Sequence, residues 1–146
     1  SFEDTVRGGG LRLDSQSTGV EVSGGINSFN VTGVTYNSTY NVSGQNRVVW
    51  SWQTNQKTSG TTNRGKPYTC HYNTDLGFSI IGHQGDGVAG HEIPHHLVIE
   101  EGQNWLHISK NRNSATAYNW LVQSNVFDAP GGEYLNLNFY LKFFGY

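Results

Sequence analysis

The sequence predicts an all-β protein, an antiparallel β-sandwich of the jelly-roll or lectin-like type. Gly, Asn, Ser and Thr make up 59 of the 146 residues, and these residues favour turns, caps and strand surfaces. Charged residues are only 14% of the chain, and no long run has the period of an amphipathic helix. Short alternating segments separated by Gly, Asn and Pro are the third observation, and they are typical of a sandwich or barrel.

Alternation of apolar and polar residues predicts the individual strands in chain order. Residues 19–23 alternate through Val20 and Val22, and residues 47–53 place Val48, Trp50 and Trp52 on one face. Further strands are expected at residues 78–82, 96–99, 105–109, 119–123 and 134–144. The tryptophans lie inside such segments, so we expect them to pack in the core; they are Trp50, Trp52, Trp105 and Trp120.

Residues 54–67 differ in composition, because Pro67 is their only apolar residue. We expect a long surface loop or a linker there. The chain is expected to form a single unit over residues 1–146, or two half-modules, 1–53 and 68–146, joined by this linker. It opens at Ser1 without Met and stops within a predicted strand, so we interpret it as an excerpt of a longer polypeptide.

Charge and hydropathy exclude several classes of partner. Nine basic residues face eleven acidic ones, for a net charge of -2, which gives no electrostatic footprint for nucleic acid. No apolar stretch approaches the ~20 residues of a membrane span. We therefore expect neither nucleic-acid binding nor membrane insertion. The single cysteine, Cys70, excludes an internal disulfide framework.

The segment from His91 to His95 matches the zinc-protease pattern of two histidines and a glutamate. That chemistry requires a helix, which points both imidazoles at one zinc ion. Pro94 opposes a helix, because it lacks an N–H and clashes with the carbonyl of Gly90. His91, His95 and His96 stay candidate ligands of a metal ion shared between subunits, against ordinary surface hydrogen bonds. No cofactor is predicted.

The remaining motifs favour structural roles. Gly85-Asp86-Gly87 is interpreted as a hairpin turn, where Asp-Gly supplies positive φ angles. Cys70 and His71 are adjacent on a strand, so their side chains point to opposite faces. No nucleophile, base and orienting group are brought together by the sequence alone, and we expect no catalytic residues and no enzyme.

Tyrosines outside the strongest strand patterns are the candidate binding residues. Tyr36, Tyr40, Tyr68 and Tyr118 lie in loop-like segments, where aromatic faces can pack on sugar rings. They define the candidate binding surface.

Several motifs together resemble a β-rich module of virion structural proteins in tailed, particularly marine, bacteriophages. One set is GFSII at residues 77–81, GDG at 85–87, IPH at 93–95, ISKNR at 108–112, and Trp120. The other set is DTVRG at residues 4–8 and NRVVWSW at 46–52, with a glycine-led strand near Phe29. In that family the first set precedes the second, and glycines are usual at the positions of His96 and Val98.

This resemblance implies a virion component at the tail, a fibre or the capsid surface. Its partners would be copies of itself and other virion proteins, with contact to host-surface glycans. A secreted carbohydrate-binding module, using Tyr36, Tyr40 and the 54–67 loop, is an alternative from another class. A glycan-degrading enzyme is a second alternative.

Overall fold

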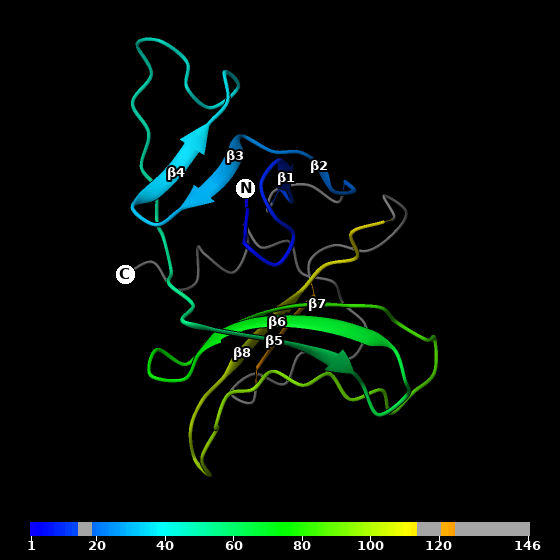
Figure 1. Ribbon diagram of the computed structural model, residues 1–146. Coiled ribbons are helices and arrows are strands. Elements are labelled where there is room, and N and C mark those ends of the chain that lie inside the picture. The colour runs from blue at the N-terminus through cyan, green and yellow to red at the C-terminus, as the bar shows by residue number, and fades with distance from the viewer. Residues whose placement is uncertain (15–18, 114–120, 125–146) are drawn as a thin grey trace. The chain divides into compact units, whose positions relative to one another are not determined.

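The computed structural model describes residues 1–14, 19–113 and 121–124 (Figure 1). These residues form nine short strands and no helix, and every strand pairing among them is antiparallel. The predicted all-β, antiparallel fold is therefore confirmed. The finer expectation of two sheets packed as a sandwich stays a prediction.

The chain divides into two compact units, each built from separate stretches of sequence. Unit 1 contains Ser1–Glu3, Gly9–Tyr40 and the described residues from Ile99 onwards. Unit 2 contains Asp4–Gly8 and Asn41–Val98.

Unit 1 contains three two-stranded ribbons. They pair β1 (Leu11–Arg12) with β2 (Val22–Ser23), β3 (Ile26–Asn30) with β4 (Gly33–Tyr36), and β8 (Leu106–Ser109) with β9 (Leu121–Ser124). Leu13 is the buried hydrophobic residue that the structure describes here. The Tyr40 ring covers Gly25, where a Cβ would lie 2.0 Å from Tyr40 Cγ, so only glycine fits.

Unit 2 is built on a three-stranded sheet in the order β5-β6-β7. The strands are β5 (Gln56–Thr61), β6 (Pro67–Asn73) and β7 (Phe78–His83), drawn side by side in green in Figure 1. Cys70, in the central strand, is fully buried. Its Sγ lies 3.2 Å from Ser79 Oγ on β7, which places the described core of this unit at the centre of the sheet.

The N-terminal segment Asp4–Gly8 packs on this sheet. The carboxylate of Asp4 accepts hydrogen bonds from the backbone N–H groups of Val6 and Arg7, at 3.0 Å each, and pairs with the Arg7 guanidinium. Thr5 Oγ1 is hydrogen-bonded to Nδ1 of His71 at 2.6 Å. A Cβ at Gly82 would lie 3.1 Å from Val6, so the turn sits against β6 and β7.

The expectation of a loop or linker at residues 54–67 is wrong for its central part. Residues 56–61 form β5, and Pro67 begins β6. β5 is an edge strand with mostly exposed side chains, so it needs no apolar residues. Backbone pairing with β6, from Gln56 opposite Tyr72 to Thr61 opposite Pro67, is sufficient to hold it.

Two predicted strands are absent from the described residues, where segments 47–53 and 96–99 have no strand partner. Alternation marks a β-like face, but a strand also needs a neighbour for its backbone hydrogen bonds. In the second segment, His96 has a φ of 58°, which ends any extended backbone. The Asp86-Gly87 turn has the expected positive φ at Gly87, but within residues 84–105 no second strand completes a hairpin.

Other strand predictions are confirmed. Residues 78–82 lie in β7, and β8 covers most of 105–109. β9 overlaps 119–123, and β2 covers the end of 19–23. The strand predicted at 134–144 lies outside the described residues.

Candidate functional site

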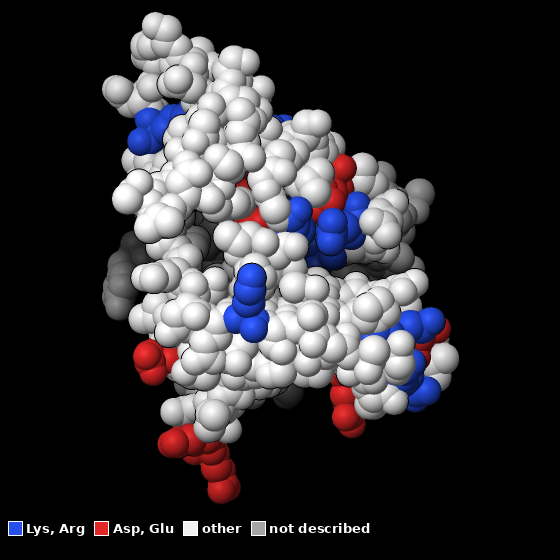
Figure 2. Space-filling view, in the orientation of Figure 1, with Lys and Arg blue, Asp and Glu red and all other residues white. Residues whose placement is uncertain are grey.

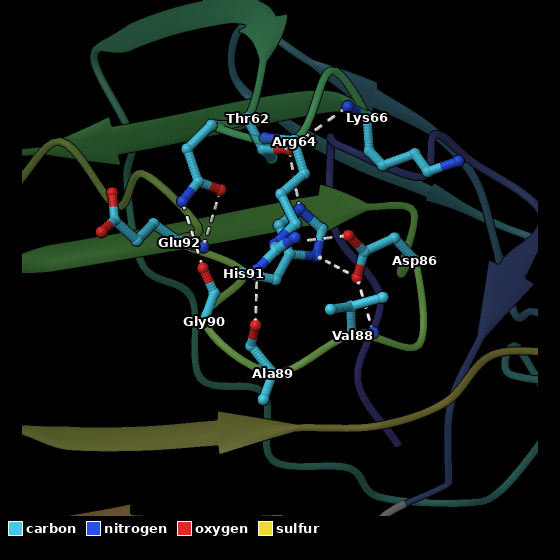
Figure 3. Close-up of polar contacts among 10 residues, drawn as sticks. Thr62, Arg64, Lys66, Asp86, Val88, Ala89, Gly90, His91 and Glu92 are labelled. Carbon is cyan, nitrogen blue, oxygen red and sulfur yellow. Dashed lines mark hydrogen bonds and ion pairs between the residues drawn. The ribbon is translucent and has the colours of Figure 1, made fainter.

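A polar cluster centred on His91 joins the β5–β6 turn to the loop after β7 (Figure 3). We call Thr62, Asn63, Arg64, Asp86 and His91 the His91 cluster. His91 Nε2 lies 2.7 Å from Thr62 Oγ1, and His91 Nδ1 lies 3.6 Å from Asp86 Oδ1. Arg64 donates from Nη2 to the carbonyl of Ala89 at 2.6 Å. Asn63 donates to the carbonyl of Gly90 and accepts from the N–H of Glu92.

The hydrogen bonds of Thr62 determine the tautomer of His91. Thr62 Oγ1 accepts the backbone N–H groups of Lys66, at 3.2 Å, and Arg64, at 3.4 Å. These occupy both lone pairs of the hydroxyl, so its proton is left to donate to His91 Nε2. In its neutral form the imidazole then carries its proton on Nδ1, facing the carboxylate of Asp86.

Asp86 is held as a carboxylate by its neighbours. Its Oδ1 accepts the backbone N–H of Val88 at 3.0 Å, and its Oδ2 lies 3.5 Å from Arg64 Nε. The Val88 hydrogen bond is the largest cause that lowers the pKa of this carboxyl, and the charges of His91 and Arg64 lower it further. The cluster therefore presents a fixed negative charge to the protonated edge of His91.

The order Thr62, His91, Asp86 has the geometry of a nucleophile, a base and an orienting group. Accessibility argues against that use, because Thr62 is only 5% exposed and its oxygen already has three partners. A substrate carbonyl could not approach it without displacing the turn. What the geometry does is fasten the 84–92 loop to the β5–β6 hairpin.

The sequence indicates individual residues of the His91 cluster but not that they lie together. His91 belongs to the zinc-protease pattern, and Asp86 belongs to the predicted Gly-Asp-Gly turn. Thr62 lies in the segment that is expected to be a loop, and no motif marks it. The missing signal was the strand β5, which carries Thr62 beside the loop after β7. The interpretation that residues 91–95 do not form a zinc-protease helix agrees with the structure, which has no helical turn there.

The histidines proposed as metal ligands do not converge on one point. His91 faces Thr62 and Asp86, whereas the ring of His96 stacks on Tyr68 and Tyr72. His95 is exposed, and its Nδ1 accepts the backbone N–H of Leu97. Among the described residues, no group of three or more His, Cys, Asp and Glu side chains is placed to hold a metal ion.

His96 belongs to an aromatic stack on β6. Its ring lies 5.7 Å from that of Tyr68 and 5.2 Å from that of Tyr72, and its Nε2 is hydrogen-bonded to the Tyr68 hydroxyl at 3.0 Å. Tyr68 was expected in a loop, but β6 includes it. The stack covers the same strand face as Cys70, whose thiol donates to the carbonyl of His95.

The other candidate tyrosines lie in unit 1 or outside the described residues. Tyr36 ends β4, and its ring lies 6.0 Å from that of Tyr40. The hydroxyl of Tyr40 is hydrogen-bonded to Ser1 Oγ, and burial raises the pKa of this phenol. Tyr40 is therefore partly a packing residue. Tyr118 lies outside the described residues.

The tryptophans of the 47–53 segment are exposed, so the expectation that they pack in the core is wrong. Val48 is 86% exposed, Trp50 76% and Trp52 57%, and Val49 is exposed as well. Trp52 keeps one neighbour, because its ring stacks on Phe78 with 6.0 Å between centroids. Trp105 is also exposed, and Trp120 lies outside the described residues.

These observations define an all-β protein with small antiparallel sheets, a closed polar cluster and exposed aromatic side chains. Residues 1–140 match the model of a family described as a domain of unknown function, DUF7483, and the chain belongs to that family. Neither the curated proteins nor the solved structures searched give a match. The described residues include no helix long and apolar enough to cross a membrane.

Proposed function

We propose that this chain is a structural component of a tailed-bacteriophage virion, assembled in multiple copies at the capsid surface, tail or a fibre. The proposal rests on the motif resemblance, and the protein's place would be the extracellular particle. Its partners would be copies of itself and other virion proteins, with host-surface glycans as a contact. It would perform no catalysis.

One structural observation carries the proposal. Residues 4–8, 46–52, 77–81, 85–87 and 93–95 belong to unit 2, whereas residues 108–112 and Phe29 belong to unit 1. Thr5 and Val6 of the DTVRG segment meet β6 and β7 directly. This contact joins the DTVRG segment of one motif set to β7, the strand that carries GFSII of the other set, and it supports a common module.

The surface of the described residues supports assembly by contact between apolar faces. Charged side chains lie in separate small groups on the face shown in Figure 2, with uncharged surface between them. Exposed large hydrophobic residues are numerous, and four of them lie between residues 48 and 52. Such contiguous exposed apolar residues mark interaction sites.

The oligomeric mass of the full chain tests this function. We expect native mass spectrometry and sedimentation to give a defined oligomer at micromolar concentration. A monomer at all concentrations that binds an array of glycans would instead favour the carbohydrate-binding module. Turnover of a glycan by the purified chain would favour the enzyme alternative.

A further inference from the structure

We propose that residues 47–53 form an antiparallel strand pair with the same residues of a second copy of this chain, centred on Trp50. The inference rests on the proposed multi-copy assembly, and it names one contact of that assembly. In this register Val48 lies opposite Trp52 of the second copy, and Trp50 lies opposite its own counterpart.

Several backbone N–H and C=O groups of residues 47–53 are available for pairing with another strand. Within the part of the chain that the structure describes, the backbone groups of Val48, Val49 and Trp50 make no hydrogen bond. Unpaired N–H and C=O groups beside β-branched and aromatic side chains are a template for adding a strand. The segment leads directly into β5 (Figure 1), so an added strand would extend an existing β element.

One end of the segment is already anchored. Trp52 stacks on Phe78, the first residue of β7. The next residue, Gln53, accepts a hydrogen bond at its carbonyl from Asn73 Nδ2 at 3.2 Å, and the N–H of Asn55 donates to the carbonyl of Tyr72. A held segment loses less conformational entropy on pairing than a loose one.

Side-chain pattern and charge favour a second copy as the occupant. The two-fold register gathers Val48, Trp50 and Trp52 of both copies on one face, where aromatic cross-strand pairs stabilise a ribbon. Arg47 is the only charged residue between residues 41 and 56, and this register sets it opposite the neutral Gln53. The two arginines lie at opposite ends of the ribbon, about 20 Å apart, beyond the ~8 Å Debye length of physiological salt.

Cysteine cross-linking tests the register. Directly opposed residues in an antiparallel pair have Cα atoms about 4.5–5.5 Å apart, within the range that a disulfide spans. We expect W50C to form a covalent dimer on mild oxidation. V48C alone should not, because its two copies would lie about 14 Å apart. An equimolar mixture of V48C and W52C chains should give the mixed dimer only.

The wild-type chain is the matched control, since Cys70 is fully buried and should give no covalent dimer. A second measurement uses W50K, which we expect to weaken self-association at least about tenfold, as loss of a central interface tryptophan does. V31K, at a fully exposed hairpin tip in unit 1, should leave the association unchanged.

The outcomes separate this inference from the proposed function. If the wild type is oligomeric but neither W50C nor the mixture of V48C and W52C chains cross-links, or V48C alone cross-links as well as W50C, the inference is overturned while assembly stands. If the wild type is monomeric throughout, both are overturned. If W50K instead abolishes binding of a glycan by a monomer, the segment is a sugar site and the inference fails.

Discussion

At the residue scale, His96 combines a left-handed backbone with close aromatic contacts. A non-glycine residue at positive φ carries a conformational cost of about 1–2 kcal/mol, and the stack on Tyr68 and Tyr72 offsets it. The motif resemblance places glycine at this position. Compared with glycine, the histidine has a higher conformational cost at this φ, but it gains a hydrogen bond and two ring contacts.

This balance predicts an unusual order of stabilities. H96A should lower the free energy of unfolding by about 1–3 kcal/mol, because it loses the contacts and keeps the backbone cost. H96G loses the same contacts, but glycine adopts a positive φ without the conformational cost that alanine pays. The decrease in its free energy of unfolding should therefore be about 1 kcal/mol smaller than that of H96A. Urea titration of both variants checks this, and equal losses would contradict it.

Cys70 is expected to be chemically silent in the folded chain. Burial raises the pKa of its thiol, and the thiolate is the reactive form. Labelling with a chromogenic disulfide reagent at neutral pH should be at least about a hundredfold slower in buffer than in denaturant, since it needs an opening that costs several kcal/mol. Prompt labelling of the native protein would show that β6 opens readily.

Asp86 gives stability a defined pH dependence. Its pKa is lower in the folded chain than its ordinary value of 3.8, so its contribution is complete above that value. The contribution is lost as pH falls through the folded pKa. In D86N, the free energy of unfolding should therefore decrease less steeply than in the wild type as pH falls below about 4. Thermal unfolding of both chains at several pH values between 2 and 7 measures this, and D75N, at an exposed position of the same unit, is the matched control.

At the element scale, Thr62 is the link between the β5–β6 turn and the loop after β7. T62V keeps the shape of the side chain but leaves the N–H of Lys66 and the imidazole of His91 without their partner. We expect a loss of about 1–3 kcal/mol in unfolding free energy. T61V, one position earlier and exposed, should change it by less than about 0.5 kcal/mol. Similar losses in both would remove the special role of Thr62.

Strand prediction from sequence succeeded where a side-chain face and a neighbouring strand occur together. β7 carries apolar residues against β6, so its alternation was readable. The sequence does not indicate β5, because backbone hydrogen bonds to β6 hold this strand. Such bonds do not require particular side chains, so no pattern of residue types reveals them. Residues 47–53 show the reverse, since their pattern is that of a strand but the described part of the chain provides no partner.

The candidate site was predictable only in fragments. Asp86 and His91 are near in sequence, and each drew attention through a local motif. Thr62 joins them only through the register of β5, which no local pattern specifies. The sequence predicts loop positions for the tyrosines, but Tyr68 lies in β6 and Tyr40 packs over Gly25, because burial depends on contacts between distant segments.

At the scale of the whole molecule, the low charge predicts how assembly should respond to salt. Nine basic and eleven acidic residues give little long-range attraction between copies, and the proposed contact is mainly apolar. We expect the oligomeric mass to be unchanged between about 50 and 500 mM NaCl, because screening acts only on charges. Sedimentation at the two salt concentrations checks this, and dissociation at high salt would indicate an ionic contact instead.

The packing of Asp4–Gly8 on the sheet of unit 2 has a consequence for folding. Thr5 and His71 are 66 positions apart in sequence, so the contact closes a long loop of chain. During synthesis, residues 4–8 are made well before β6 and β7, so their contact partners do not yet exist when they emerge. Contacts so distant in sequence slow folding, and a deletion of residues 4–8 would leave the sheet of unit 2 to fold without this segment.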